Sequence, residues 1–292
     1  MKILVTGATG HFGKAVIDFL LKKGTPVTSI TALVRDEAKA ENLNTLGIEL
    51  RKGEYEDYAS LVKAFTGVDK LLLVSSNDID NRRAQQANAV KAATEAGVKH
   101  ILYTSFVRTD ETDASPIAFV AQSHIQTEKL IQESGIPYTI FRNNLYMDFV
   151  PVFIGEKVLE SGVYWPAGST PGAYALREEM AEAAANVLSG TGHEYQTYNI
   201  SNTSTWTFQQ VAETISKASG KTIGYISPSQ EEYKAVLTQA GVPAQYIAMF
   251  AGFAEAIRLG EFDSAAGTDL EKLLGRKPTS LTDYLTSVYG KK

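Results

Sequence analysis

Cysteine is absent from the 292 residues of this chain. Its absence excludes disulfide bonds, thiolate zinc sites, iron–sulfur clusters and a cysteine nucleophile. Long apolar runs are also missing: none reaches the ~18 residues that indicate a membrane span. The apolar stretch before Gly7 is too short for a signal peptide. Since a lack of cysteine also suits a reducing compartment, we expect a cytoplasmic protein.

Clustered charge of one sign is missing as well. The sequence has 28 Lys and Arg against 33 Asp and Glu, a net charge of −5, and no block of five like charges. The basic pairs Arg82-Arg83 and Lys291-Lys292 are typical of a solvated surface. Because nucleic-acid binding requires a clustered basic footprint, we expect neither nucleic acid nor a membrane as a partner.

What is present is the composition of a globular protein, with 44% hydrophobic and 21% charged residues. A chain of this length lies near the size at which one hydrophobic core divides into two. We therefore expect one large domain accompanied by a smaller lobe.

Short apolar runs alternate with amphipathic stretches through the first half of the chain. The pattern predicts strands over 3–5, 27–34, 48–51, 70–74, 100–104 and 138–141, and helices over 11–23, 36–46, 58–65, 83–96 and within 117–134. Strands that are apolar on every face and alternate with helices form a parallel sheet covered on both sides. The prediction is an α/β fold, a doubly wound parallel sheet of the Rossmann type. In such a fold, ligands bind beyond the carboxyl ends of the strands, so the residues just after each strand are site candidates.

The rhythm changes after residue 150. Aromatic residues and prolines gather over 146–171, and a helix near 178–188, a strand over 195–200 and helices over 208–218, 230–240, 243–259 and 270–274 follow. We predict a Rossmann dinucleotide-binding domain over residues 1–150. Residues 151–292 are expected to form a smaller, mostly helical lobe that caps the substrate, with roughly 176–200 returning to the Rossmann sheet.

A glycine loop lies between the first strand and the first helix. The segment from Thr6 to Gly13 has glycines at 7, 10 and 13. The first glycine allows a tight turn, the second lets the backbone approach a pyrophosphate, and the third lets the helix pack against the strand. The helix N-terminus then offers N–H groups and partial positive charge to the phosphates. The predicted cofactor-binding residues of the loop are Gly7, Thr9, Gly10, His11, Phe12 and Gly13; the alternative is a plain strand–helix turn.

The residue after the second strand indicates which dinucleotide binds. An acidic residue there favours NAD, whereas an arginine meets the 2′-phosphate of NADP and stacks on adenine. Arg35 comes first, and Asp36 follows. We therefore expect NADP(H) as the preferred cofactor, with NAD(H) possible. The other role open to Asp36 is that of a helix N-cap.

These residues resemble the NmrA-like branch of the atypical short-chain dehydrogenase/reductases. The resemblance lies in the segments 5–13, 32–35, 97–105, 136–143 and 198–208, and it covers nearly the whole chain. Within that branch the chain is most similar to the bacterial NAD(P)H:quinone oxidoreductase and triphenylmethane reductase subgroup. The resemblance implies an NADPH-dependent reductase that uses neither flavin nor metal and acts on flat conjugated acceptors, often as a homodimer.

The chain departs from the wider superfamily at the helix after the fifth strand. Ordinary members carry Tyr-x-x-x-Lys there to protonate the substrate, but this chain has His124 and Glu128 at that spacing, with Lys129 one place beyond. The departure disfavours a carbonyl–alcohol dehydrogenase. A quinone or a cationic dye needs less help, because its conjugated system accepts hydride directly and solvent protonates the product.

Site candidates follow from this resemblance and from the strand ends. Ser75 and Ser76 follow the fourth strand, where the family lines the cofactor ribose, and Thr104 and Lys129 are further cofactor-binding candidates. Catalytic candidates are Ser105 and Asn143, which come after the fifth and sixth strands, and His124, whose ordinary pKa of ~6.5 suits a proton donor. Plainer alternatives are two small residues closing a strand for Ser75 and Ser76, a turn hydroxyl for Ser105, an i, i+4 pair with Glu128 for His124, and a surface position for Lys129.

Aromatic residues supply candidates for a pocket wall on which a flat acceptor stacks. The six candidates are Phe106, Tyr146, Phe149, Phe153, Tyr164 and Trp165. Because pockets hold few such side chains and most aromatics belong to a core, we expect two or three of the six to face the ligand.

The sequence thus predicts an NAD(P)H-dependent oxidoreductase that transfers hydride to a quinone or similar small-molecule acceptor. The alternative is a non-catalytic NADP(H)-binding sensor of the NmrA-like type, which also lacks the tyrosine. A sugar-nucleotide epimerase shares the loop and the fold, but it normally needs the tyrosine acid–base.

Overall fold

Seven strands form the main sheet, in the order β3-β2-β1-β4-β5-β6-β8. The computed structural model describes residues 1–263 and 268–290. The strands are β1 Ile3–Val5, β2 Ile30–Val34, β3 Glu49–Lys52, β4 Lys70–Leu73, β5 His100–Phe106, β6 Tyr138–Asn143 and β8 Gln196–Ile200. The pairs from β3 through β6 are all parallel. The strand order reverses between β1 and β4, which is the switch point where doubly wound sheets bind ligands. The predicted fold class is confirmed.

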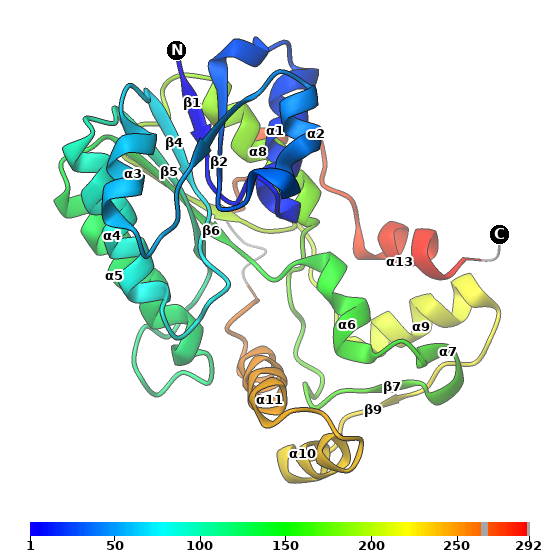
Figure 1. Ribbon diagram of the computed structural model, residues 1–292. Helices are drawn as coiled ribbons and strands as arrows, with labels where there is room; N and C mark the ends of the chain where they lie inside the picture. Colours follow the sequence, from blue (N-terminus) through cyan, green and yellow to red (C-terminus); the bar gives the residue numbers. More distant parts are fainter. Residues whose placement is uncertain (264–267, 291–292) are drawn as a thin grey trace. The chain divides into compact units, whose positions relative to one another are not determined.

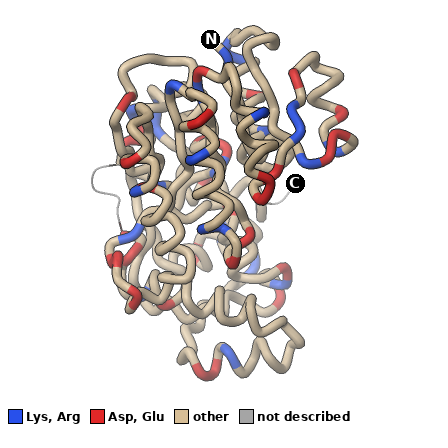
Figure 2. The backbone as a smooth tube through the Cα atoms, turned by 60° about the vertical axis from the view of Figure 1, so that its left-hand side comes forward, with Lys and Arg blue, Asp and Glu red and all other residues tan. Residues whose placement is uncertain are grey.

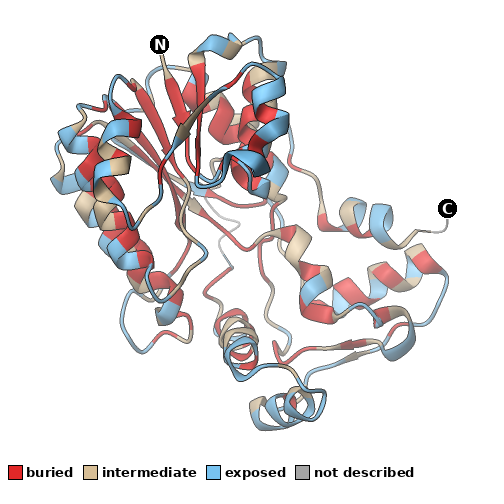
Figure 3. Ribbon diagram, in the orientation of Figure 1, coloured by how far each residue is buried: buried red, intermediate tan, exposed pale blue. Residues whose placement is uncertain are grey.

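Helices cover both faces of this sheet (Figure 1). They are α1 His11–Lys22, α2 Glu41–Thr45, α3 Tyr58–Phe65, α4 Arg82–Glu95, α5 Ala118–Glu133 and α8 Arg177–Ser189. Helices α3, α4 and α5 lie on one face, and α1 and α8 on the other. Phe65, Ala89 and Ile131 of the first group pack on Leu71 and Ile101 of the sheet. Figure 3 shows the result: the central strands β1, β2 and β4 are buried along their length, the edge strands β3 and β8 are partly exposed, and the outer faces of the helices are exposed.

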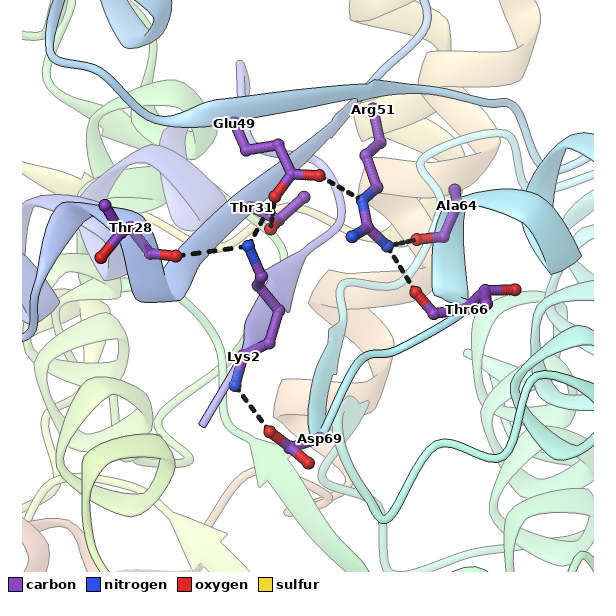
Figure 4. Close-up of polar contacts among 8 residues, drawn as sticks. All are labelled: Lys2, Thr28, Thr31, Glu49, Arg51, Ala64, Thr66 and Asp69. Atoms are coloured by element: carbon purple, nitrogen blue, oxygen red, sulfur yellow. Dashed lines mark hydrogen bonds and ion pairs between the residues drawn. The ribbon is translucent and has the colours of Figure 1, made fainter.

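Charged side chains fasten the amino ends of the strands, at the edge away from the glycine loop (Figure 4). Glu49 accepts hydrogen bonds from Lys2 Nζ at 2.6 Å and from Arg51 Nε at 2.7 Å. The backbone N–H of Lys2 donates to Asp69 at 2.8 Å. These two cations hold the pKa of the Glu49 carboxyl down at about 2. The network joins β1, β3 and the start of β4 where no ligand is expected.

The element bounds differ from the predicted ones at several strand ends. The predicted strand 27–34 begins with a short 3₁₀ turn, Val27–Ser29, and only then becomes β2. The predicted helix 36–46 is a 3₁₀ turn, Glu37–Ala40, followed by α2. β5 and β6 are longer than predicted and include Ser105 and Asn143, because these polar residues are buried and keep their backbone pairing with the neighbouring strand.

The chain divides into two compact units that are interleaved along the sequence. Unit 1 comprises residues 1–106, 120–143 and 178–198, and it contains most of the main sheet. Unit 2 comprises residues 107–119, 144–177 and 199–292. Its elements are η3 Met147–Phe149, α6 Val150–Ile154, α7 Val158–Ser161, β7 Val163–Tyr164, α9 Phe208–Ser219, β9 Tyr225–Ile226, α10 Gln230–Gln239, α11 Ala244–Arg258, α12 Leu270–Leu274 and α13 Leu281–Tyr289.

Unit 2 is mostly helical, as predicted for the C-terminal part. Sequence patterns did not reveal α13 or the two-stranded parallel sheet of β7 and β9. The interior of the unit is aromatic: the Phe153 and Trp165 rings stack with centroids 4.8 Å apart, and Trp165 lies 5.7 Å from Phe208.

Charged residues are spread along the chain. Acidic and basic residues are intermixed along the backbone tube (Figure 2). Across the described residues, none of the helices combines the length and the apolarity needed to cross a membrane.

Candidate active site

The glycine loop follows β1 and turns into α1. Gly7 adopts a φ of +60°, which favours glycine. The Gly10 N–H donates to the Gly7 carbonyl at 2.9 Å and closes the turn. A Cβ on Gly13 would lie 2.4 Å from the Gly7 oxygen and 2.9 Å from the Thr6 oxygen. The third glycine is therefore required for the helix to approach the strand, as the spacing predicts.

The loop leaves the N-terminus of α1 open. Gly10 is the N-cap and has no side chain to cap the helix. Thr9, Gly10 and His11 are exposed. The first N–H groups of a helix have no partner within it and form a site for an anion. Phe12 is buried, so only its backbone N–H is available to a ligand.

Arg35 and Asp36, at the end of β2, have different roles. Both are exposed. The Asp36 carboxylate accepts the Ala38 N–H at 3.1 Å and caps the 3₁₀ turn that follows. This is the capping role left open by the sequence. Arg35 makes no hydrogen bond or ion pair to any residue in the described part of the chain, so its guanidinium is available to a ligand.

The ends of β4 and β5 are joined through hydroxyl groups. The Ser75 N–H donates to Thr104 Oγ1 at 2.8 Å, and the Thr104 hydroxyl approaches Ser75 Oγ at 3.4 Å. Ser76 Oγ accepts the Asp78 N–H at 3.2 Å. Ser75 and Ser76 are half-buried and Thr104 is buried. The structure thus brings three of the predicted cofactor-binding residues together beside the switch point.

Ser105 is held by a buried carboxylate. Its hydroxyl donates to Glu128 of α5, whose two oxygens also accept Arg142 Nε at 3.2 Å and Nη2 at 2.7 Å. These hydrogen bonds of Glu128 reach β5 and β6, which no periodicity in the sequence could reveal. Arg142 was a candidate only by its place after the predicted strand 138–141, and Glu128 is a site residue that the sequence pattern did not indicate.

Asn143 lies at the end of β6 and is 2% exposed. Its side-chain oxygen and nitrogen are both buried, and within residues 1–263 and 268–290 neither has a hydrogen-bond partner. Leaving buried polar atoms unpaired is costly, so such a group in a native protein calls for a ligand or another explanation.

His124 is also buried, at 4% exposure. Its Nδ1 lies 2.8 Å from the Tyr103 hydroxyl, and its Nε2 lies 3.3 Å from Arg82 Nη1. Lys129 is different: its side chain is 73% exposed and 3.8 Å from Glu133 one turn along α5. Lys129 thus occupies the surface position that was its plainer alternative, while a role in cofactor binding stays a prediction.

The aromatic candidates fall into two groups. Phe153 and Trp165 are buried in the interior of unit 2. The half-buried ones are Phe106, Tyr146, Phe149 and Tyr164. The Arg177 guanidinium lies over the rings of Tyr146 and Phe149, at 5.1 and 5.4 Å from their centroids. Only the half-buried group has ring surface left for a ligand.

Comparison with known proteins agrees with this geometry. A family model described as the NmrA-like family matches residues 1–285. Quinone oxidoreductase 2 of Escherichia coli is 39% identical over 98% of both chains. An NAD(P)H azoreductase of Xenophilus azovorans is 30% identical over 82% of both chains. The crystal structure of Citrobacter sp. triphenylmethane reductase complexed with NADP(H) superposes with a TM-score of 0.89 at 41% identity, covering 98% of this chain and 99% of that one.

Proposed function

The chain belongs to the NmrA-like family, and on that premise we propose that it is an NADPH-dependent reductase which transfers hydride to a quinone or a similar flat, conjugated acceptor. The observation that carries the proposal is the glycine loop, whose open helix N-terminus stands at the switch point of the sheet. The named activities of the relatives, on quinones, azo compounds and triphenylmethane dyes, support this acceptor class.

The loop residues fit a dinucleotide. Gly7 and Gly13 shape the turn, and exposed Gly10 has no side chain to hold a pyrophosphate away from the N–H groups of His11 and Phe12. These N–H groups bind the phosphates, and the dipole of α1 favours their negative charge. Thr9 stands exposed on the same turn and adds a hydroxyl.

NADPH is preferred over NADH because of Arg35. Its guanidinium meets the 2′-phosphate, which NADH lacks. Asp36, the residue that would favour NADH, is engaged in capping the turn after β2. The NADP(H) bound to the Citrobacter relative supports the same preference.

The ends of β4, β5 and β6 receive the ribose and nicotinamide. Bound NADPH supplies the hydride. Ser75 and Ser76 line the ribose, and Thr104 fixes Ser75 by its hydrogen bond. Asn143 offers an amide donor and an amide acceptor to the carboxamide, which would satisfy its unpaired atoms. The Ser105 hydroxyl donates a hydrogen bond to Glu128, and a hydroxyl oxygen also has acceptor lone pairs.

No tyrosine acid is required for this chemistry. Tyr103 is fully buried, its hydroxyl donates to Gln86, and burial raises its pKa well above the ordinary value. It is therefore unsuited to giving up a proton. Conjugation delocalises the charge that arrives with the hydride, and solvent protonates the product oxygen. The chain contributes orientation of the two reactants.

The test is a turnover assay with purified protein. NADPH absorbance is followed while benzoquinone, a naphthoquinone and a triphenylmethane dye are added in turn, with NADH in parallel. Protein-dependent loss of NADPH with at least one acceptor is expected. NADPH binding seen by fluorescence without consumption by any acceptor would instead establish the non-catalytic sensor.

Other expectations from the sequence stay predictions: the cytoplasmic location, the absence of nucleic-acid and membrane partners, the homodimer and the capping role of residues 151–292.

A further inference from the structure

Four polar side chains form a buried chain between β5 and the helices α4 and α5. Arg82 and Gln86 come from α4, Tyr103 from β5 and His124 from α5, and none is more than 7% exposed. The contacts run from Arg82 Nη1 to His124 Nε2 at 3.3 Å, from His124 Nδ1 to the Tyr103 hydroxyl at 2.8 Å, and from that hydroxyl to Gln86 Oε1 at 2.6 Å.

The hydrogen bonds among these four side chains allow only one assignment of donors and acceptors. A guanidinium has donors and no acceptor, so His124 Nε2 must accept. The imidazole then carries its proton on Nδ1 and donates it to the Tyr103 oxygen. The Tyr103 hydroxyl in turn donates to Gln86 Oε1. His124 is therefore neutral in this arrangement, and the nitrogen facing Arg82 has no proton to give.

Arg82 also contacts the turn after β4, where the ribose is predicted to bind. Its Nε donates to the backbone carbonyl of Ser76. In the same turn, the Ser75 N–H donates to Thr104 Oγ1. Two hydrogen bonds thus hold the turn that follows β4: one to the Thr104 hydroxyl of β5 and one from the Arg82 guanidinium of α4. The guanidinium is itself oriented by His124.

We infer that His124 is a positioning residue for the cofactor: it accepts a hydrogen bond from Arg82 and thereby fixes the Ser75–Ser76 turn against the ribose of NADPH. The inference rests on the proposed function, and it assigns His124 a role other than the proton donor that its residue type suggests. Arg82 enters the site as the link between His124 and the turn. The inferred role involves no proton transfer through these four side chains.

Two substitutions distinguish positioning from acid catalysis. In His124→Gln, the amide oxygen accepts from Arg82 and the amide nitrogen donates to Tyr103, so both hydrogen bonds are retained by a group that does not titrate. In His124→Leu, both are lost, and Arg82 Nη1 no longer has the imidazole nitrogen as an acceptor. We expect H124Q to keep the wild-type KM for NADPH. We expect H124L to raise that KM about tenfold, the usual scale for a lost charge-assisted hydrogen bond, with kcat changed less than threefold.

The pH dependence of kcat gives a second readout. Among the described residues, the charged groups Arg82 on α4 and Glu128 on α5 act on Tyr103, and Arg82 also contacts His124. A positioning residue predicts that kcat of H124Q follows the wild-type pH profile. Loss of one limb of the profile, together with a kcat reduced at least a hundredfold in both H124Q and H124L, would overturn the inference and establish His124 as the acid.

Binding measurements separate this inference from the proposed function. The Kd for NADPH is measured by fluorescence titration on wild type, H124Q, H124L and the exposed α5 control Gln132→Ala. A weaker Kd in H124L alone supports positioning even if no acceptor is reduced. Equal Kd values in all four proteins contradict it even if wild type is an active reductase. Thermal unfolding of each variant shows whether H124L has folded. If it has not, Arg82→Lys replaces it, because lysine keeps the charge without the planar fork. Arg82→Lys is expected to raise the Kd for NADPH by a similar factor.

Discussion

Replacing Gly13 by alanine has two opposite effects on the free energy of unfolding, a gain in helix propensity and a steric overlap. Gly13 is the third residue of α1, and alanine in a helix is favoured over glycine by ~1 kcal/mol. The new Cβ, however, would lie 2.4 and 2.7 Å from the oxygen and carbon of Gly7 and 2.9 Å from the oxygen of Thr6. These atoms are backbone and cannot rotate away. Overpacking of this kind costs ~1–3 kcal/mol or more, so we expect a net destabilisation of about 2 kcal/mol.

The assay is urea unfolding of G13A beside wild type, with the NADPH Kd measured on the same samples. Because relief of the overlap displaces the Gly7 turn, the Kd is expected to rise at least tenfold. The matched control is Gly224→Ala, where an added Cβ meets nothing within 4 Å, and it should change neither quantity appreciably. A G13A protein about 1 kcal/mol more stable than wild type would show that the overlap costs nothing, because helix propensity alone would then account for the result.

Three further predictions concern other parts of unit 1. Arg35→Ala should raise the Kd for NADPH at least tenfold and leave that for NADH nearly unchanged in parallel titrations; equal losses would remove the 2′-phosphate assignment. Asn143→Leu should leave the free energy of unfolding unchanged or raise it by about 1 kcal/mol, since both amide atoms are unpaired, while lowering kcat/KM about tenfold; the opposite pattern would make Asn143 structural. Burial lowers the pKa of His100 from 6.5 to about 4. Between these pH values His100 binds a proton in the unfolded chain but not in the folded chain. Stability should therefore fall by up to ~3 kcal/mol between pH 6.5 and pH 4, and less in His100→Gln, as measured by urea unfolding at both pH values.

The fold was predictable because its signals are local. The apolar runs that became β1, β4 and β5 are each followed by a helix, and this alternation requires a parallel sheet. The glycine loop was predictable for the same reason, because Gly10 and Gly13 are required by contacts within the loop and Gly7 by its own positive φ.

The hydrogen-bonding of the site was not predictable, because it joins residues far apart in the sequence. Nothing near Glu128 indicates that it accepts from Ser105 and Arg142, and nothing near Arg82 indicates that it reaches both Ser76 and His124. The nearest signal was that polar residues occur where β5 and β6 end in otherwise apolar strands. The missed elements of unit 2 have a similar cause. β7 and β9 have only two residues each, and such short strands show no periodicity.

The interleaving of the two units has a consequence for how this protein is made and modified. The chain leaves unit 1 after β5, returns at Val120 within α5, leaves again after β6, returns at Glu178 within α8 and leaves for the last time within β8. No single cut releases either unit whole, so a fragment ending near residue 150 would lack α8 and the edge strand of the sheet. During synthesis, the sheet stays open at one edge until β8 has emerged from the ribosome. The same arrangement makes unit 2 a set of insertions at strand ends, where lengthening or exchanging a segment leaves the glycine loop and its strands untouched.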